Sequence, residues 1–286
     1  MDLRRLRLFL AVVDQDGFTA ASRAEHVSQP AVSLAVRELE AELGAPLLVR
    51  SRGGVTLTAA GEALVPHARR SLRSVEHAVV AVGEVTGLVA GHLDLTTLPT
   101  LAADPVADLV GRFRLAHAAV SVHLSAPNSL DELADDVRSG SAEVGITEQG
   151  PANDGLAELH LYDQELLAVS PPGQPSAEVR IDRLQGTPLV LTPRGSSLRD
   201  TVAIALAAAD VVPDVAVETA QRDALIPLVL AGAGTTFLPT QLAEQARQLG
   251  AVVRRTTPRL RRTIVLVHRR DALGPAGRRF IELAVG

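Results

Sequence analysis

The stretch from Ser28 to Gly44 constrains the fold more than any other part of the sequence. Ser28 suits a helix N-cap, Pro30 is tolerated in a first turn, and Gly44 suits the end of the helix. One face of this helix is apolar, with Val32, Val36, Leu39 and Leu43. Another face carries Gln29, Ser33 and Arg37 at a spacing of four residues. The first face predicts packing, and the second carries hydrogen-bonding groups that suit base edges and phosphates.

The segments around this helix predict a winged helix-turn-helix over residues 1–58. Residues 3–13 form an apolar stripe at helical spacing, and Thr19 is a plausible N-cap for a short helix that ends at Ala24. Residues 47–49 and 55–57 resemble two short strands joined by a turn with Gly53 and Gly54, which would form the wing.

A long helix is predicted to follow the wing, as a linker and dimerisation helix over residues 59–88. Its apolar positions alternate between spacings of four and three, as in a coiled-coil seam: Ala68, Leu72, Val75, Val79 and Val82. The alternative is a core helix within one domain, which periodicity alone leaves open.

Beyond Gly87, apolar strands alternate with helical stretches up to the end of the chain. Strands are expected at residues 93–97, 120–125 and 144–147, with helices at residues 105–116 and 130–139 between them. Such alternation is typical of βαβ units and predicts a largely parallel sheet within residues 89–286.

Several motifs now identify a family resemblance. They are Phe18-Thr19-Ala20-Ala21-Ser22, Val27-Ser28-Gln29-Pro30-Ala31-Val32-Ser33, Leu39-Glu40-x-Glu42-Leu43-Gly44-x-Pro46-Leu47-Leu48-x-Arg50 and Leu57-Thr58-x-Ala60-Gly61. In residue identity and spacing they resemble the N-terminal signature of LysR-type transcriptional regulators. Two later elements resemble the regulatory domain of that family, namely Ser139-Gly140-x-x-Glu143-Val144-Gly145-Ile146 and Leu230-Ala231-Gly232-Ala233-Gly234-x-x-Phe237-Leu238-Pro239.

The resemblance implies an α+β multidomain fold: an N-terminal winged helix-turn-helix, a long linker helix and a C-terminal two-lobed α/β effector domain resembling periplasmic binding proteins. Lobe I would comprise about residues 91–161 plus 267–286, and lobe II about residues 162–266. It also implies a sequence-specific regulator that forms a homodimer or homotetramer. Its partners would be double-stranded promoter or operator DNA, a small-molecule effector and RNA polymerase.

The family pattern also implies the residues that contact DNA. Gln29, Pro30 and Ser33 would lie at the mouth of the recognition helix in the major groove, and Arg50 and Arg52 would contact the backbone or the minor groove. Arg37 is a further candidate for contact with DNA. The alternative is that Arg37 is a solvated side chain that only pairs with nearby glutamates. Leu34 stands where the family often has a polar contact residue.

The effector site follows from a general rule, because ligands of open α/β sheets bind beyond the carboxyl ends of the strands. The candidates in these loops are Thr97, Thr100, Asn128, Ser129, Thr147, Ser196 and Ser197. Ser196 and Ser197 precede a helix, so we expect a small anionic effector near them and Thr100. The alternative is that these hydroxyls only cap helices. We expect no other cofactor and no metal.

Composition limits which other classes of function the chain can have. The chain of 286 residues has no cysteine, which excludes disulfides and thiolate chemistry, and its net charge of −5 indicates that any DNA binding depends on local placement of arginine. No signal peptide or membrane span is apparent, which predicts a cytoplasmic protein.

The sequence shows no enzyme motif around its titratable residues, among them His92, Asp94, His117 and His123. A sensor module with little DNA binding is the alternative function. The arginines at residues 254–262 are interpreted as a solvated face rather than a second nucleic-acid patch.

Overall fold

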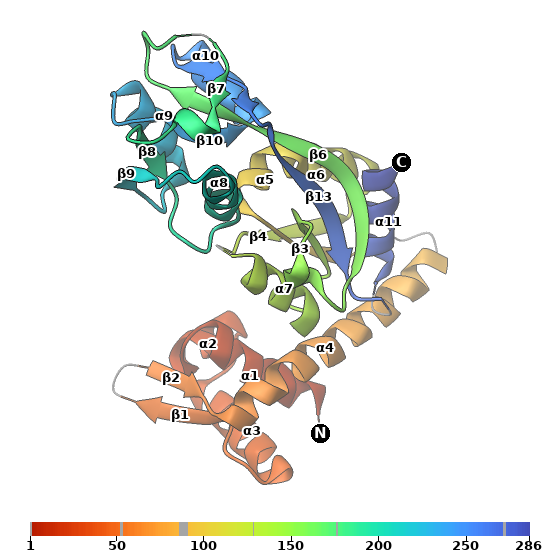
Figure 1. The fold of residues 1–286 in the computed structure, drawn as a ribbon. Helices are drawn as coiled ribbons and strands as arrows, with labels where there is room; N and C mark the ends of the chain where they lie inside the picture. Colours follow the sequence, from red (N-terminus) through yellow and green to blue (C-terminus); the bar gives the residue numbers. More distant parts are fainter. Residues whose placement is uncertain (1, 52–53, 86–90, 128, 176, 271–272) are drawn as a thin grey trace.

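The computed structural model describes residues 2–51, 54–85, 91–127, 129–175, 177–270 and 273–286. An N-terminal head of three helices and a hairpin is joined by one long helix to a two-lobed α/β domain (Figure 1). None of the helices in these ranges combines the length and hydropathy needed to cross a bilayer.

The head is a winged helix-turn-helix. Its elements are α1 (Leu3–Asp14), α2 (Phe18–Ala24), α3 (Gln29–Leu43), β1 (Leu48–Ser51) and β2 (Gly54–Leu57). Strands β1 and β2 pair antiparallel. The predicted N-cap Thr19 is wrong by two positions, because α2 begins at Phe18 after Gly17. Leu43 is also not a core residue: it is 42% exposed because the last turn of α3 extends beyond the core of the head.

Helix α4 (Ala59–Val85) leaves the head and runs beneath the two-lobed domain (Figure 1). Two of the predicted seam residues pack into the core of the head itself, since Ala68 is fully buried there and Leu72 lies against it. Val75 is 44% exposed. The side chains of Val79 and Val82 lie outside the described residues. Helix α4 is thus anchored at its start in the head, and is not the core helix of a single domain.

Lobe I contains strands β3, β4 and β5 and the helices that cover them. Its elements are β3 (Gly91–Thr97), α5 (Pro99–Leu101), α6 (Ala107–Ala116), β4 (Val120–Ser125), α7 (Leu130–Ser139), β5 (Val144–Glu148) and α11 (Pro275–Val285). Strand β3 pairs parallel with both β4 and β5. The core is built on buried leucines, valines and two phenylalanines, Phe113 and Phe280, whose rings meet edge to face.

Lobe II is built from the chain between residues 171 and 259. Its elements are β7 (Val179–Arg180), β8 (Pro188–Leu191), α8 (Ser197–Ala208), β9 (Asp214–Glu218), α9 (Leu225–Leu230), β10 (Thr236–Pro239), α10 (Thr240–Gln248), β11 (Val252–Arg254) and β12 (Thr256–Thr257). Strands β8 and β9 pair parallel. Two hydrophobic clusters of this lobe are separate from the core of lobe I.

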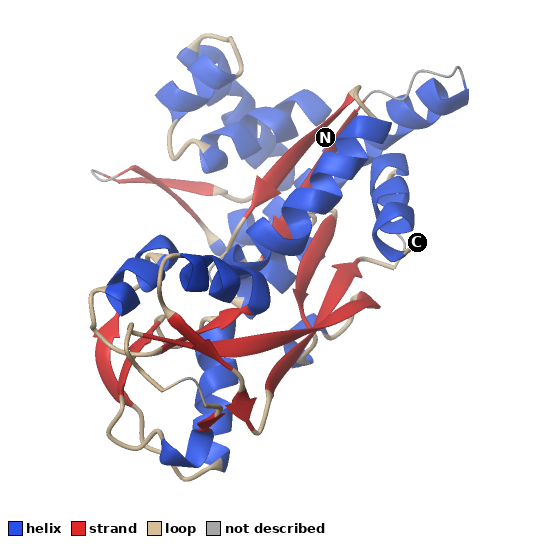
Figure 2. Cartoon of the chain, turned by 90° about the horizontal axis from the view of Figure 1, so that it is seen from above, coloured by secondary structure: helices blue, strands red, loops and turns tan. Residues whose placement is uncertain are grey.

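Two long strands connect the lobes, β6 (Ala157–Ser170) and β13 (Leu260–His268), which pair antiparallel along nearly the whole length of β13. The main sheet has the order β10-β6-β13-β5-β3-β4, with β11 also paired to β6. The prediction of a largely parallel sheet is therefore wrong, because both crossover strands pair antiparallel with their neighbours. In Figure 2 the strands form the middle of this domain and helices lie on either side.

Candidate functional site

The polar edge of α3 is open to solvent. Gln29, Pro30 and Arg37 are exposed, and Ser33 is half-buried. The Arg37 guanidinium donates its Nε–H to the Ser33 carbonyl oxygen at 3.2 Å. The predicted reading edge therefore lies on the surface, and Leu34 beside it is 50% exposed.

The opposite edge of α3 is held firmly in the head. Val32, Val36 and Leu39 are at most 2% exposed and pack in one core with Phe9 and Val12 of α1. Burial of these side chains fixes the orientation of the helix, so that its polar edge points outward.

Two motif residues that sequence reasoning left without a role fix the wing. Glu40 Oε1 accepts hydrogen bonds from the Leu47 and Leu48 amides at 2.8 and 3.3 Å, which ties α3 to β1. Gly61 lies so close to the wing that a Cβ atom would be 2.1 Å from the Leu47 carbonyl oxygen. A side chain at residue 61 would push the wing away from α4.

The wing arginines are only partly described. The backbone of Arg50 lies in β1 opposite Val55. Its side chain and the whole of Arg52 lie outside the described residues, so their predicted DNA contacts stay predictions.

In the two-lobed domain, the guanidinium of Arg262 forms the centre of a buried polar network. The side chain is fully buried on β13, and its nitrogens donate to Thr100 Oγ1 at 2.9 Å, to Ser197 Oγ at 2.9 Å and to Gln164 Oε1 at 2.6 and 2.8 Å. Burial lowers the pKa of Arg262, and nearby Glu148 opposes that shift. Thr100 belongs to lobe I and Ser197 to lobe II, so one cation bridges both lobes.

The counter-charge of Arg262 comes from Glu148, at the end of β5. Its Oε2 lies 3.8 Å from Arg262 Nη1 and accepts a hydrogen bond of 2.5 Å from Ser197 Oγ. Its Oε1 accepts from Thr201 Oγ1 at 3.3 Å. The position at the start of α8 where we expected a ligand anion is therefore filled by a carboxylate of the protein itself.

A cavity of about 190 Å³ brings two other predicted residues together. Ser129 of lobe I and Ser196 of lobe II both line it, along with Arg194, Gly195 and Arg222. Arg222 is half-buried, burial lowers its pKa, and its Nε has no hydrogen-bond partner among the described residues. Arg194 and Arg222 were missed by sequence reasoning, because isolated arginines in loops carry no pattern.

The remaining predicted effector residues lie elsewhere. Thr97 is fully buried and donates to the Ile146 carbonyl oxygen at 3.0 Å, so its hydroxyl links two strands. Thr147 is also fully buried within β5. Neither side chain lines the cavity. Asn128 lies outside the described residues.

The hydroxyls of Ser129 and Ser196 also have local bonds. Ser129 Oγ accepts from the Glu132 amide at 3.1 Å and so caps α7. Ser196 Oγ lies 2.7 Å from Thr192 Oγ1 and donates to the Pro193 carbonyl oxygen at 2.8 Å. Capping is thus part of the role of Ser129, as the alternative interpretation held.

The interpretation of residues 254–262 as a solvated face is wrong for two arginines. Arg255 and Arg261 are exposed, whereas Arg254 is partly buried and Arg262 is 3% exposed. Strand alternation places Arg262 on the same face as the buried Leu260 and Ile264, so period two is the signal that could have found it.

The histidine and aspartate on β3 face the linker helix rather than a cavity. Asp94 Oδ2 lies 3.4 Å from His92 Nε2 and 3.8 Å from Arg73 Nη2 of α4. Burial raises the pKa of Asp94, but the hydrogen bond from His92 and the charge of Arg73 outweigh it and hold that pKa below its usual value.

Comparisons with known proteins agree with this arrangement. Residues 3–62 match the family profile of the bacterial regulatory helix-turn-helix protein, lysR family, and residues 86–286 match that of the LysR substrate binding domain. The transcriptional regulator TfdS of Cupriavidus pinatubonensis is 30% identical over 99% of this chain and 98% of its own. The nitrogen assimilation regulatory protein of Klebsiella aerogenes is 28% identical over 99% of this chain and 94% of its own.

Solved structures give the same result. Full-length CbnR in complex with its target DNA is similar with a TM-score of 0.71 and 25% identity over 99% of both chains. Full-length OxyR from Pseudomonas aeruginosa, 24% identical, shares the fold with a TM-score of 0.78 over 99% of this chain and 93% of its own. The chain therefore belongs to the LysR family of transcriptional regulators, with a DNA-binding helix-turn-helix head and an effector-binding domain.

Proposed function

We propose that this regulator binds promoter DNA in the cytoplasm as a homodimer or homotetramer, and that a small anionic effector in the cleft between its lobes controls it. We assign no enzymatic activity to it. The observation that carries the proposal is the cavity between Ser129 and Ser196, where two arginines lie without a carboxylate among the lining residues.

The charges on the two sides of the start of α8 differ. Arg262 is balanced by Glu148, whereas the Nε of half-buried Arg222 lacks a partner among the described residues. A partly desolvated cation without a partner favours an anionic ligand, because the ligand would supply both the missing acceptor and the missing charge. The effector carboxylate is therefore proposed at Arg222 and Arg194, beside Ser196, rather than at Thr100 and Ser197.

Helix α7 offers a route from this cavity to the DNA-binding head. Ser129 caps its N-terminus at the cavity, and the body of α7 packs against linker helix α4 (Figure 1). An effector that favours one closure of the lobes would shift α7 against α4 and change the spacing of two recognition helices in a dimer. Two heads related by twofold symmetry would then fit half-sites about one helical turn apart.

Calorimetry with a panel of small mono- and dicarboxylates tests the effector site. We expect one acid to bind the full-length protein with saturation, and Arg222→Gln to weaken it about ten- to hundredfold through loss of a charged hydrogen bond. Arg247→Gln is the matched control, since Arg247 is an exposed residue of α10. Equal binding by the Arg222→Gln protein would refute this position for the effector.

A footprinting assay on the promoter region upstream of the gene tests the proposed DNA binding. We expect protection of two half-sites, with the bound acid changing its extent or strength. Absence of protection with and without the acid would instead favour the sensor alternative.

A further inference from the structure

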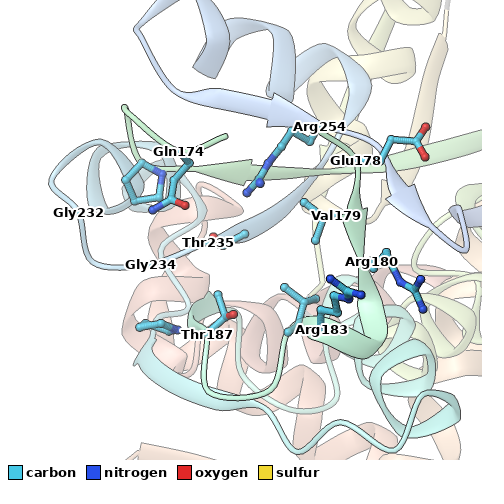
Figure 3. Close-up of a pocket in the computed structure, with 13 residues that line it drawn as sticks. Gln174, Glu178, Val179, Arg180, Arg183, Thr187, Gly232, Gly234, Thr235 and Arg254 are labelled. Carbon is cyan, nitrogen blue, oxygen red and sulfur yellow. The ribbon is translucent and has the colours of Figure 1, made fainter. Parts of the chain in front are cut away.

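A second and larger cavity lies within lobe II, and it shares no lining residue with the cleft. Its volume is about 390 Å³, within the range of small-molecule sites. The walls come from β7, the turn that follows β7, the start of β8, the loop after α9, and β11 (Figure 3). Thr187, Thr235 and Arg254 point toward the same space in this view.

Arg254 is the partly buried cation of this cavity. Its Nη2 donates to Ser170 Oγ at 2.6 Å, while its buried Nε has no hydrogen-bond partner among the described residues. Within the part of the chain that the structure describes, no carboxylate lies within 4.0 Å of this guanidinium. Burial lowers the pKa of Arg254, as expected for a cation that lacks a counter-charge.

A hydroxyl that is linked to Arg254 through Ser170 also lies at the cavity wall. Ser170 Oγ accepts from Arg254 and lies 2.8 Å from Thr235 Oγ1, and either of these two hydroxyls can donate to the other. Thr235 lines the cavity, and when Ser170 is the donor the Thr235 hydroxyl has a proton for a ligand. The Arg254 guanidinium and the Thr235 hydroxyl thus border the same space, where both can donate to an anion.

The other charged residues at the cavity do not supply that acceptor. Arg180 donates to Asp182, with Nε to Oδ1 at 3.1 Å. Glu178 Oε2 accepts a hydrogen bond of 2.9 Å from Thr257. Arg183 lies exposed at the wall and has no ion pair with any residue in the described ranges. The net charge of the lining residues is positive, which favours an anion.

We propose that this cavity of lobe II is a second ligand site, separate from the cleft, for a small molecule that carries a phosphate or carboxylate group. An anionic oxygen of the ligand accepts hydrogen bonds from the Arg254 guanidinium and from Thr235 Oγ1, with Ser170 then donating to Thr235, and Arg183 adds a second positive charge at the wall. The site lies apart from the arginines of the cleft, so it can be occupied whether or not the cleft is.

Binding of inorganic phosphate and of succinate to the full-length protein tests this site, with sodium chloride at matched ionic strength as the salt control. We expect saturable binding of at least one of the two, and the one that binds identifies the group that the site prefers. Arg254→Gln should weaken it about ten- to hundredfold, because a charged hydrogen bond is lost. Binding of neither anion would overturn the proposal.

Three further variants keep the test decisive. Arg183→Gln alters an exposed side chain that the fold does not require, and it should weaken binding severalfold even if the Arg254 variant does not fold. Arg247→Gln, on exposed α10, should bind like the unaltered protein. Arg222→Gln should also leave this binding intact, and its loss in that variant would assign the anion to the cleft and refute a second site.

Discussion

Two carboxylates of the effector-binding domain, one partly and one fully buried, lie in different surroundings. Glu148 is held by Arg262 and two hydroxyl groups. Glu143 is 2% exposed and accepts a hydrogen bond from the Gly274 amide at the start of α11. Burial raises the pKa of Glu143, and this outweighs the opposing effects of that hydrogen bond and of Arg73. Glu143, a residue of the family motif, thus links the start of β5 to α11 and has a pKa above its usual value.

The raised pKa of Glu143 makes stability depend on pH in a defined direction. Between its usual value of 4.5 and its raised value, the folded state binds more protons than the unfolded state, so stability falls as pH rises through this window. We expect Glu143→Gln to remove that fall while its amide oxygen still accepts from Gly274. Urea unfolding followed by circular dichroism from pH 4 to pH 7 measures this.

The control for this prediction is Glu244→Gln, which alters an exposed carboxylate on α10. It should leave the pH dependence unchanged. If the Glu143→Gln protein lost stability with rising pH as steeply as the unaltered protein, the raised pKa would be wrong.

At the scale of elements, periodicity predicted where helices and strands lie but not how strands pair. The helix at residues 130–139 and the strand at residues 120–125 were predicted within a residue, because caps and apolar spacing are local signals. Pairing of β13 between β5 and β6 joins segments about 100 residues apart, and no local pattern encodes it. Strand alternation could have shown that Arg262 is buried, but not what it contacts, since its partners lie on four other elements.

The crossover strand β13 offers a direct test of the network. Arg262→Ala removes the only charge that balances partly buried Glu148 within the described network and leaves the buried partners of Arg262 without their donor, which should cost about 1–3 kcal/mol in the free energy of unfolding. Arg261→Ala, on the exposed face of the same strand, should change it by less than about 0.5 kcal/mol. Equal unfolding midpoints in urea would show that the network does not stabilise the domain.

Helix α3 carries the prediction for DNA. Gln29 is exposed in the first turn, where an amide can bond to a base edge, so Gln29→Ala should weaken specific operator binding about five- to hundredfold. Binding to unrelated DNA should change little, because phosphate contacts remain. Gel-shift titrations measure both, with Gln248→Ala on α10 as the control. A uniform loss on both DNAs would assign Gln29 to phosphate contact instead.

At the scale of the whole molecule, α4 connects the head to lobe I through charged contacts as well as through the chain. Arg69 pairs with Asp14 in the head, and Arg73, 8% exposed, approaches Asp94 of β3. The apolar spacing of this segment correctly predicts a long helix, but it also predicts that the whole apolar stripe forms a seam with another chain. Part of that stripe instead packs into the head of the same chain, because apolar spacing alone does not specify which surface a helix packs against.

The stability of the protein should depend on a single charge at this junction between α4 and β3, that of Asp94. Asp94→Asn removes a carboxylate that lies 3.8 Å from the buried Arg73 guanidinium and should lower the free energy of unfolding by about 1–3 kcal/mol. Asp108→Asn, which breaks an exposed pair with Arg112 on α6, should have little effect. Equal losses in the two proteins, measured by urea unfolding, would contradict a special role for the junction.

The position of β13 also affects how the protein is made. This strand lies between β5 and β6 in the sheet, yet it is formed by residues 260–268, which follow both strands and all of lobe II in the chain. On the ribosome the head can fold early, whereas β5 and β6 lack the strand that separates them until residue 268 has emerged. Their open backbone edges are the places where a nascent or truncated chain would recruit a chaperone or aggregate.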